Sequence, residues 1–578
     1  MAANKVAIFG LIATLAVAGA VAAAIILAGN TNTKTTKDQT NNISTSQKAI
    51  QDLCQSTYYQ QTCTETLSNA TNSSDPQTLI QTIFEIAISH LNNTIQQSGP
   101  LQQISNDPKT SQAYKTCTKV LDDSIQDLRK TIHRTETFDF FDFSIFIDDI
   151  KTWLTGALTY QETCLDSFED TKGDHAETMR QLLKLSRELT TNGLAIANQI
   201  HRLFLPNLLA PPVAPTKHQL ADRKPLSPRG DSNYYRKLLQ MASDRRYDTP
   251  NVVVAKDGSG KYKTVTEALK EVPERSNETF VIHVKEGVYE EYVEITSGMW
   301  SVVLVGDGPT KTRITGKKSY GGDGLGTYFT ATFLLYFEMI YVGIDGDNFI
   351  GKDIGFENTA GAIGYQAVAL RVSADKAIFY NCHIDGYQDT LYAHNHRQYY
   401  RDCTISGTID FIFGNARALI QNCTLLVRKP LDNQACVVTA NGRTLSNETS
   451  AFVIHGSRVV AAPEYPVDDK RIQSFLGRPW KEYSKTIFMA SEIEGFISPE
   501  GWSPWDNTAD HLDTCWYAEV GNRGPGADLT NRVKWPGIKN ITMAEAAQFA
   551  PTMYMDSGHW IEGKGIPFDS VLEMVIKN

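Results

Sequence analysis

The chain has 578 residues, of which 41% are hydrophobic and 21% are charged. This composition is typical of globular protein, and the length exceeds that of one ordinary domain. The formal net charge is -10, so the polyanionic backbone of a nucleic acid is not expected as a partner.

The N-terminus begins with an uncharged apolar run from Val6 to Gly29 that directly follows Lys5. Its length suits a helix that spans a bilayer. It equally suits a long signal peptide, because Ala22 to Ala24 offer small residues for cleavage. A buried helix of a soluble domain is the plain alternative. We interpret residues 1–29 as a signal peptide or signal anchor, the only part expected to meet a membrane, and residues 30–45 as a polar linker.

The rest of the chain carries signs of export. Acceptor sequences for N-glycosylation occur at eight positions: Asn42, Asn69, Asn72, Asn92, Asn277, Asn422, Asn447 and Asn540. The chain has nine cysteines, and most cysteines pair in an oxidising compartment. The odd number leaves at least one thiol free.

Residues 46–203 are predicted to form a helical bundle, because apolar residues recur every three or four positions and Gly and Pro are few. Cys54 and Cys63 are close enough in sequence to join a short helical hairpin. Cys117 and Cys164 would then join two longer helices. The alternative is four unpaired core cysteines, which is uncommon in exported proteins.

Residues 204–249 are predicted to be an exposed linker, because they are rich in proline and basic residues. The segment Arg236, Lys237, Leu238 and Leu239 places a basic pair before two leucines, where a processing protease could reach it. A solvated basic pair with no such role is the alternative.

Residues 250–578 show short strand-like runs separated by Gly, Asn and Asp, and some of them repeat. Three similar segments place cysteines at 382, 403 and 423, and Phe349 to Phe356 is a weaker earlier copy. A period near twenty is typical of a solenoid with one coil per repeat, here a parallel β-helix. Equivalent residues then stack about 4.8 Å apart. We expect two of the three stacked cysteines to bond, with Cys403–Cys423 as the favoured pair.

The same period applies to polar residues. Asp389 and Asp410 are 21 residues apart, and Gln366 and Gln388 are 22 apart, so each pair is separated by about one coil. Two close carboxylates cannot both ionise cheaply, which separates an acid from a nucleophile or base. Gln amides supply the donors that an oxyanion hole needs. A ladder of polar residues that only caps the turns of the solenoid is the alternative.

Arg478 and Trp480 are the candidates for completing such a site. Arg478 could hold one Asp ionised through paired hydrogen bonds, and Trp480 could stack on a sugar ring. A surface cation–π pair is the alternative. A metal site is not predicted, since His383, His394 and His396 lack the spacing of known zinc motifs.

Four segments resemble the signature sequences of plant pectin methylesterases. They are Gln366 to Leu370 (QAVAL), Gly386 to Leu391 (GYQDTL), Asp410 to Gly414 (DFIFG) and Leu476 to Trp480 (LGRPW). The helical region resembles the pectin methylesterase inhibitor domain that often precedes the enzyme, and Arg236 to Leu239 resembles the basic processing motif between the two. The resemblance implies a right-handed parallel β-helix behind an all-α bundle.

The resemblance also implies a mechanism without metal or organic cofactor. Asp410 attacks the methyl ester, Gln388 assisted by Gln366 stabilises the oxyanion, and protonated Asp389 donates to the leaving methanol. Asp389 then acts as base on the hydrolytic water. Arg478 orients Asp410, while Trp480 and Thr327 line the sugar-binding groove.

One segment departs from the family pattern. After Phe333 the family passes almost directly to a run like Gly343 to Phe349, whereas here the mostly apolar residues 334–342 intervene. We expect this insertion to interrupt a coil. It could be a tolerated loop, or it could come from an error in the gene sequence.

The resemblance therefore implies a pectinesterase that is secreted to the cell wall and acts on methyl-esterified homogalacturonan. Its expected protein partners are inhibitor proteins and a processing protease. Two alternatives remain. One is a glycoside hydrolase, because an Asp pair about 5 Å apart also suits a retaining mechanism. The other is an inhibitor-type binding protein whose enzyme domain is inactive.

Overall fold

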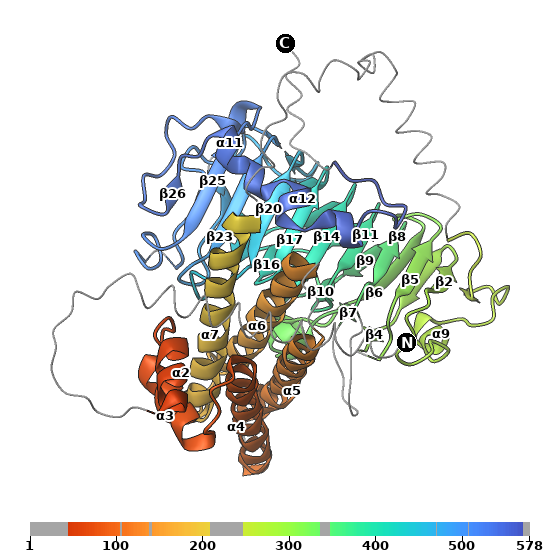
Figure 1. Cartoon of the computed structure of the whole chain (residues 1–578). Coiled ribbons are helices and arrows are strands. Elements are labelled where there is room, and N and C mark those ends of the chain that lie inside the picture. The colour runs from red at the N-terminus through yellow and green to blue at the C-terminus, as the bar shows by residue number, and fades with distance from the viewer. Residues whose placement is uncertain are drawn as a thin grey trace, which may run out of the picture. The chain divides into compact units, whose positions relative to one another are not determined.

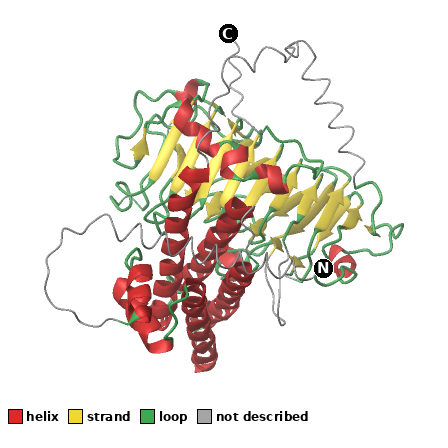
Figure 2. Cartoon of the chain, in the orientation of Figure 1, coloured by secondary structure: helices red, strands yellow, loops and turns green. Residues whose placement is uncertain are grey.

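The computed structural model describes residues 44–104, 107–137, 142–208, 247–296, 298–335, 347–469, 471–506 and 508–569. The chain divides into two compact units. One comprises residues 1–106 and 117–235, and the other comprises residues 107–116 and 236–578. Helices make up the described part of the first unit, and strands dominate the second (Figure 2). The predicted leader and the Arg236 to Leu239 motif lie outside the described residues.

The helical part of the chain contains a short helical hairpin followed by long helices. These are α2 (Thr45–Cys54), α3 (Gln60–Ala70), α4 (Pro76–Ile104), α5 (Pro108–Glu136), α6 (Phe143–Asp166) and α7 (His175–Leu208). The first of them begins at a capping box, in which the Ser44 side chain accepts from the Gln47 amide and the Gln47 side chain accepts from the Ser44 amide. None of the described helices combines the length and the apolar character needed to cross a bilayer.

Two disulfides connect these helices. Cys54 bonds to Cys63 within the hairpin, and Cys117 bonds to Cys164 between α5 and α6. Both pairs are those that the cysteine spacing predicts. Each bond closes a loop of the unfolded chain, which stabilises the folded unit by reducing the entropy of the unfolded state.

A buried polar network around Gln161 holds three of the long helices in register. The Gln161 amide donates to Ser124 of α5 at 3.2 Å and to Thr190 of α7 at 3.4 Å. Its carbonyl oxygen accepts from Ser186 of α7 at 3.2 Å. Because a buried polar group without partners is costly, such a network favours one arrangement of the helices over slipped alternatives.

The second unit is a parallel β-helix made of three sheets (Figure 1). The first sheet has the order β1 (Val252–Val254), β2 (Phe280–Val284), β5 (Val302–Gly306), β8 (Ile350–Lys352), β11 (Ala377–Tyr380), β14 (Arg397–Arg401), β17 (Arg417–Gln421), β20 (Ala451–His455), β23 (Lys485–Met489), β25 (Trp516–Val520) and β26 (Ile538–Lys539). The second has the order β3 (Gly287–Glu290), β6 (Thr312–Gly316), β9 (Gly355–Asn358), β12 (His383–Asp385), β15 (Thr404–Gly407), β18 (Thr424–Val427), β21 (Arg458–Ala461) and β24 (Glu492–Ile493). The third has the order β4 (Val293–Ile295), β7 (Phe333–Leu335), β10 (Leu370–Val372), β13 (Leu391–Ala393), β16 (Ile412–Gly414), β19 (Cys436–Asn441) and β22 (Ser474–Gly477).

The repeats found in the sequence are successive coils of this helix. Ile378 of β11 is in register with Tyr399 of β14, and Tyr399 is in register with Leu419 of β17. Ile350 of β8, in the weaker copy, is in register with Ile378. The period of 21 and 20 residues is therefore the length of one coil, as predicted.

In seven consecutive coils, one corner is built by a residue in the left-handed backbone region. The corner residues between the first and second sheets are Asp353, Asn381, Asp402, Asn422, Gly456, Ala490 and Gly521, with φ between 51° and 63°. Asn and Asp tolerate this conformation better than other residues with a side chain, and Gly adopts it freely. The Asn422 amide also donates to Asp402 at 2.6 Å, which links two coils at the corner. The corner residue fixes the direction in which the chain passes from a first-sheet strand to the following second-sheet strand.

The predicted Cys403–Cys423 disulfide is wrong, since Cys382, Cys403 and Cys423 are all free and buried. The three do stack. The amide of Cys382 donates to the Cys403 sulfur at 3.4 Å, and the amide of Cys403 donates to the Cys423 sulfur at 3.3 Å. Equivalent residues of neighbouring coils project side by side about 4.8 Å apart, whereas a disulfide needs Cβ atoms about 3.5–4.5 Å apart. Cys436 and Cys515 are also free.

The predicted insertion is partly wrong as well. Leu334 and Leu335, its first two residues, belong to strand β7, which pairs with β4 and β10. They therefore continue a coil instead of interrupting it. Residues 336–342 of the predicted insertion lie outside the described residues.

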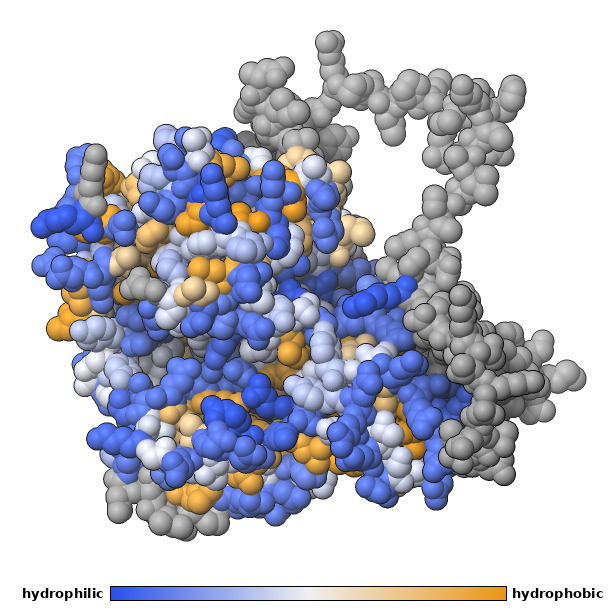
Figure 3. All heavy atoms as spheres, turned by 90° about the vertical axis from the view of Figure 1, so that its left-hand side faces the viewer, coloured by the Kyte–Doolittle hydropathy of each residue, from blue (hydrophilic) through white to orange (hydrophobic). Residues whose placement is uncertain are grey.

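Short helices complete the second unit. They are α9 (Val265–Leu269), α10 (Tyr320–Asp323), η2 (Thr327–Phe329), η3 (Ala362–Gly364), η4 (Pro525–Ala527), α11 (Met543–Ala546), η5 (Ala547–Phe549), α12 (Pro551–Tyr554) and α13 (Ser557–Trp560). The last four cover the outer face of the first sheet, where Phe549 and Trp560 share a hydrophobic cluster with Tyr399 and Leu419 (Figure 1). On the face shown in Figure 3, hydrophobic residues form small groups among hydrophilic ones.

Candidate active site

Asp389 and Asp410 occupy equivalent positions on neighbouring coils. Each lies two residues before a third-sheet strand, and the following Leu391 and Ile412 are in register. Both aspartates have left-handed backbones, with φ of 61° and 48°. The Asp389 amide donates to the Ile409 carbonyl at 3.0 Å, which ties the two turns together. Both residues are buried, with 8% and 5% of their surface exposed.

Arg478 follows strand β22 and reaches the second of these carboxylates. Its amide donates to the Thr439 carbonyl of β19 at 3.0 Å, which fixes the start of the side chain. Its Nε lies 2.9 Å from Asp410 Oδ1, and its Nη2 lies 2.5 Å from Asp410 Oδ2. Such a two-pronged contact fixes both the position and the rotation of the carboxylate.

The two carboxyl groups differ in their electrostatic surroundings. Burial and the neighbouring negative charge of Asp410 raise the pKa of Asp389 well above its usual value, against a smaller opposing effect of Arg478. Burial favours the neutral form of Arg478, but its contact with Asp410 outweighs this and raises the guanidinium pKa. The site therefore places a carboxyl group that holds its proton more tightly than usual beside a carboxylate oriented by a guanidinium, an arrangement that could separate an acid from a nucleophile.

Gln366 and Gln388 are also neighbours across one coil. Their backbones form a parallel bridge, and the Ala367 amide donates to the Gln388 carbonyl at 3.2 Å. Both side chains are partly exposed. Within the part of the chain that the structure describes, neither side-chain amide makes a hydrogen bond, so both can donate to a ligand. Gln388 directly precedes Asp389 in the chain.

A row of aromatic residues follows the same sheet. Tyr392 of β13 and Phe413 of β16 are in register, and their rings stack with centroids 4.3 Å apart. Trp480 meets Phe413 edge to face at 6.1 Å. Its ring also lies against Gly442, where an added Cβ would approach Cε3 to 2.8 Å. Tyr392 and Phe413 are buried, whereas Trp480 is partly exposed, so Trp480 is the one of these three rings that a sugar could contact.

Thr327 lies at the start of η2. The segment that follows it is tied to the segment between Gln366 and strand β10, because the Val368 amide donates to Thr330 Oγ1 at 3.0 Å. The described contacts of Thr327 are its carbonyl bonds to Thr330, and none joins it to the acid pair.

Two residues near Arg478 were not predicted. The Trp505 ring lies 4.2 Å from the Arg478 guanidinium carbon, and Asp506 Oδ1 lies 3.9 Å from Arg478 Nη1. The repeat could not reveal them, because they come from a loop beyond β24 that has no equivalent in neighbouring coils. A Trp-Asp dipeptide in a polar loop does not by itself indicate a functional role.

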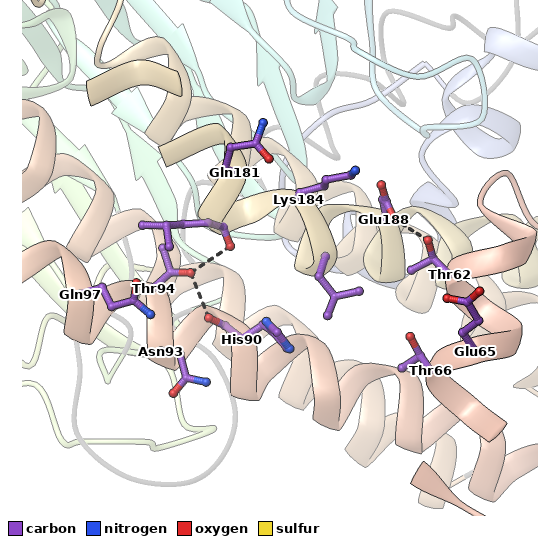
Figure 4. Close-up of a pocket in the computed structure, with 12 residues that line it drawn as sticks. Thr62, Glu65, Thr66, His90, Asn93, Thr94, Gln97, Gln181, Lys184 and Glu188 are labelled. Atoms are coloured by element: carbon purple, nitrogen blue, oxygen red, sulfur yellow. Dashed lines mark hydrogen bonds between the residues drawn. The ribbon is translucent and has the colours of Figure 1, made fainter. Parts of the chain in front are cut away.

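The helical unit contains a separate pocket of about 530 Å³ between α3, α4 and α7 (Figure 4). Thr62 donates to Glu188 at 2.6 Å along one side, and Thr94 donates to the Leu182 carbonyl at 3.3 Å on another. The lining is otherwise mostly polar and includes His90. None of the predicted catalytic or sugar-binding residues lines it.

Comparison with known families agrees with this division of the chain. A family model described as Pectinesterase matches residues 251–558. A second model, described as Plant invertase/pectin methylesterase inhibitor, matches residues 48–196.

Two curated plant relatives are similar over most of the chain. The chain is 45% identical over 530 residues to putative pectinesterase/pectinesterase inhibitor 28 of Arabidopsis thaliana, covering 91% of this chain and 70% of that protein. It is 40% identical to probable pectinesterase/pectinesterase inhibitor 58 of the same plant over 98% of both chains. Among solved structures, pectin methylesterase from carrot is 43% identical with a TM-score of 0.53, covering 56% of this chain and 98% of that one. The chain belongs to the pectinesterase family and carries, in front of the enzyme region, a region of the inhibitor family.

Proposed function

We propose that this protein hydrolyses the methyl esters of pectin and releases methanol. The observation that carries the proposal is the Asp410 carboxylate, oriented by Arg478 at 2.5 and 2.9 Å and neighbouring the buried Asp389 on the adjacent coil. An oriented carboxylate is a competent nucleophile, and an adjacent protonated carboxyl is a competent acid.

In the proposed reaction, an Asp410 oxygen forms a bond to the ester carbonyl carbon, and the amides of Gln388 and Gln366 donate to the oxyanion. The bond to the methoxy oxygen then breaks as Asp389 transfers its proton to the departing methanol. Asp389, now ionised, removes a proton from water, and the water oxygen attacks the acyl-enzyme. This step frees the galacturonate and Asp410, and Asp389 is protonated again.

The aromatic row supports a polysaccharide as the substrate. Trp480 is partly exposed and meets the buried Phe413 edge to face, so its ring is held where it could carry a sugar. We infer that Trp480 binds a sugar ring of homogalacturonan, and that Thr327 contributes to the rim of the same groove.

The direct test is methanol release from methyl-esterified pectin by the purified chain and its Asp410→Ala variant. We expect the variant to lose activity by a factor of about 10⁴ or more, because no other group replaces the nucleophile. Asp402→Asn is a matched control, since Asp402 also has a left-handed backbone, with φ of 54°, but lies at a corner outside the site. Wild-type activity in Asp410→Ala would refute the proposal, and new reducing ends without methanol would point to a glycoside hydrolase.

We further propose that the helical unit acts as an inhibitor of pectinesterase activity or assists export of the enzyme. The match of residues 48–196 to the inhibitor family supports this role. Adding the separately produced region to an active pectinesterase tests it, and unchanged methanol release at saturating amounts would exclude inhibition.

We infer that the protein is secreted to the cell wall and that a protease separates residues 46–203 from residues 250–578 at Arg236 to Leu239. The apolar N-terminal run, the eight glycosylation sequences and the two disulfides support export. N-terminal sequencing of the wall-extracted protein tests the cleavage, and an intact chain as the sole extracellular form would contradict it.

A further inference from the structure

The loop that carries Trp505 is anchored beside Arg478. Gly477, the residue before Arg478, forms a bridge with Trp502, and the Ser503 amide donates to the Gly477 carbonyl at 3.0 Å. Trp502 is 1% exposed and stacks on Tyr517 with ring centroids 4.2 Å apart. The start of the loop is thus fixed to the same strand that places Arg478.

Two residues that follow contact parts of the Arg478 guanidinium that Asp410 does not. Trp505 covers one face of the planar group at 4.2 Å, within the range of a cation–π contact. Asp506 Oδ1 lies 3.9 Å from Nη1, a different nitrogen from the two that contact Asp410. Asp506 has φ of 46°, a conformation that is uncommon for a residue with a side chain.

The Asp506 contact alone would weaken the catalytic pair. The Asp506 side chain is 71% exposed, whereas that of Asp410 is 7% exposed. Water therefore solvates the outer carboxylate, that of Asp506, while the inner carboxylate, that of Asp410, depends on Arg478 for stabilisation. A guanidinium free to rotate could turn toward Asp506 and solvent. An aromatic ring against its face restricts that rotation and excludes water from the inner contact, which strengthens it.

We propose that Trp505 is a positioning residue, which holds the Arg478 guanidinium on Asp410, while Asp506 retains the outer nitrogen. The proposal rests on the proposed function, because its measurable consequence is the rate of ester hydrolysis. Trp505 acts through Arg478 on the orientation of the Asp410 carboxylate.

The test compares Trp505→Ala and Trp505→Phe in the full-length chain, expressed in a secretory host and purified from the medium. We expect Trp505→Ala to lower kcat about tenfold with KM changed less than about twofold, since the loss affects the reacting carboxylate. Trp505→Phe should recover most of the rate, because a second aromatic face can cover the guanidinium.

Salt provides a second measure. With the ring removed, the Arg478–Asp410 pair is open to solvent, so kcat of Trp505→Ala at saturating pectin should fall further between about 0.02 and 0.5 M NaCl. Wild-type kcat should change much less. Asp506→Asn should not reproduce this loss, because it removes the carboxylate that competes with Asp410 for the guanidinium. Asp510→Asn, which changes an exposed carboxylate in the same loop, should match the wild type.

Three results would overturn the inference. A raised KM with unchanged kcat in Trp505→Ala would make Trp505 part of the sugar-binding surface instead. Equal losses in the Ala and Phe variants, with a lowered melting temperature, would make it a structural residue. Unchanged kinetics in all variants of an active wild type would refute the inference alone. A wild type that stays inactive after cleavage of the chain at Arg236 to Leu239 would refute the proposed function with it.

Discussion

Arg478 and Asp410 are 68 positions apart in the sequence, yet two guanidinium nitrogens contact both oxygens of the carboxylate at 2.9 and 2.5 Å. The contact crosses from the turn before β16 to the residue after β22. The orientation of the proposed nucleophile, Asp410, therefore depends on the shape of the Arg478 side chain as well as on its charge.

Arg478→Lys should therefore impair the enzyme although it keeps the positive charge. A single ammonium cannot hold both oxygens in one plane, so we expect kcat to fall about a hundredfold. Steady-state methanol release measures this effect. Arg471→Lys is a control, because Arg471 is exposed and pairs with the nearby Asp469 outside the site. Equal kcat for Arg478→Lys and wild type would show that charge alone suffices.

Asp389→Asn should be inactive, and its stability should depend less on pH than that of the wild type. The folded-state pKa of Asp389 is raised, chiefly by burial and then by Asp410. Between the unfolded pKa of about 3.9 and this raised value, the folded protein holds a proton that the unfolded chain releases, so wild-type stability falls as pH rises. Asn has no proton to lose. The melting temperature of the variant minus that of the wild type should therefore increase with pH from about pH 4 upward. A difference that does not change with pH would contradict a raised pKa for Asp389.

The same shift predicts the alkaline side of the activity profile. Asp389 must be protonated to donate to methanol, so kcat should decline once the pH exceeds its raised pKa. A pH profile of methanol release at saturating pectin measures this decline. A rate that continues to rise throughout the alkaline range would show that the acid is another group.

Gln388→Ala should cost more than Gln366→Ala. Gln388 directly precedes Asp389 and lies on the coil between Gln366 and Asp410, so we expect it to be the main oxyanion donor. Loss of such a donor typically lowers kcat about 10²- to 10³-fold. Stopped-flow or steady-state kinetics of both variants test the ranking, and a larger loss for Gln366→Ala would reverse the assigned roles.

Gly442→Ala should act on substrate binding through Trp480. The new methyl carbon would lie 2.8 Å from Trp480 Cε3, so the ring must shift. We expect a raised KM for pectin with a smaller change in kcat, together with altered tryptophan fluorescence. Gly99→Ala is a suitable control, because an added Cβ at Gly99 would meet no atom within 4 Å. Gly456→Ala is not, because Gly456 has φ of 57°, which would strain a residue with a side chain.

Much of the enzyme region could be predicted because its period is visible in the sequence. The steps of 21 and 20 residues place Asp389 next to Asp410, and the register of Leu391 with Ile412 agrees with that placement. The cysteine pairs of the helical region were also accessible, since their spacing suits one hairpin and two long helices.

The same period misled where it was applied to covalent bonds. Stacking brings Cys403 and Cys423 to adjacent positions, but parallel side chains at strand spacing do not present disulfide geometry. Trp505 and Asp506 were inaccessible for the opposite reason: they come from a loop outside the repeat, and only the folded chain brings them to Arg478.

The corner residues with left-handed backbones set a rule for insertions and deletions during evolution. From Asn381 to Asp402 and on to Asn422 the corners are 21 and 20 residues apart, whereas the next interval, to Gly456, is 34. The coil after Asn422 is thus longer than the two before it, while its corners stay aligned. The coils of Asp389 and Asp410 lack that freedom, because a single added residue between the two would move one carboxylate out of alignment with the other. Length variation among descendants of this gene should therefore accumulate after Asn422 and be purged between Asn381 and Asn422.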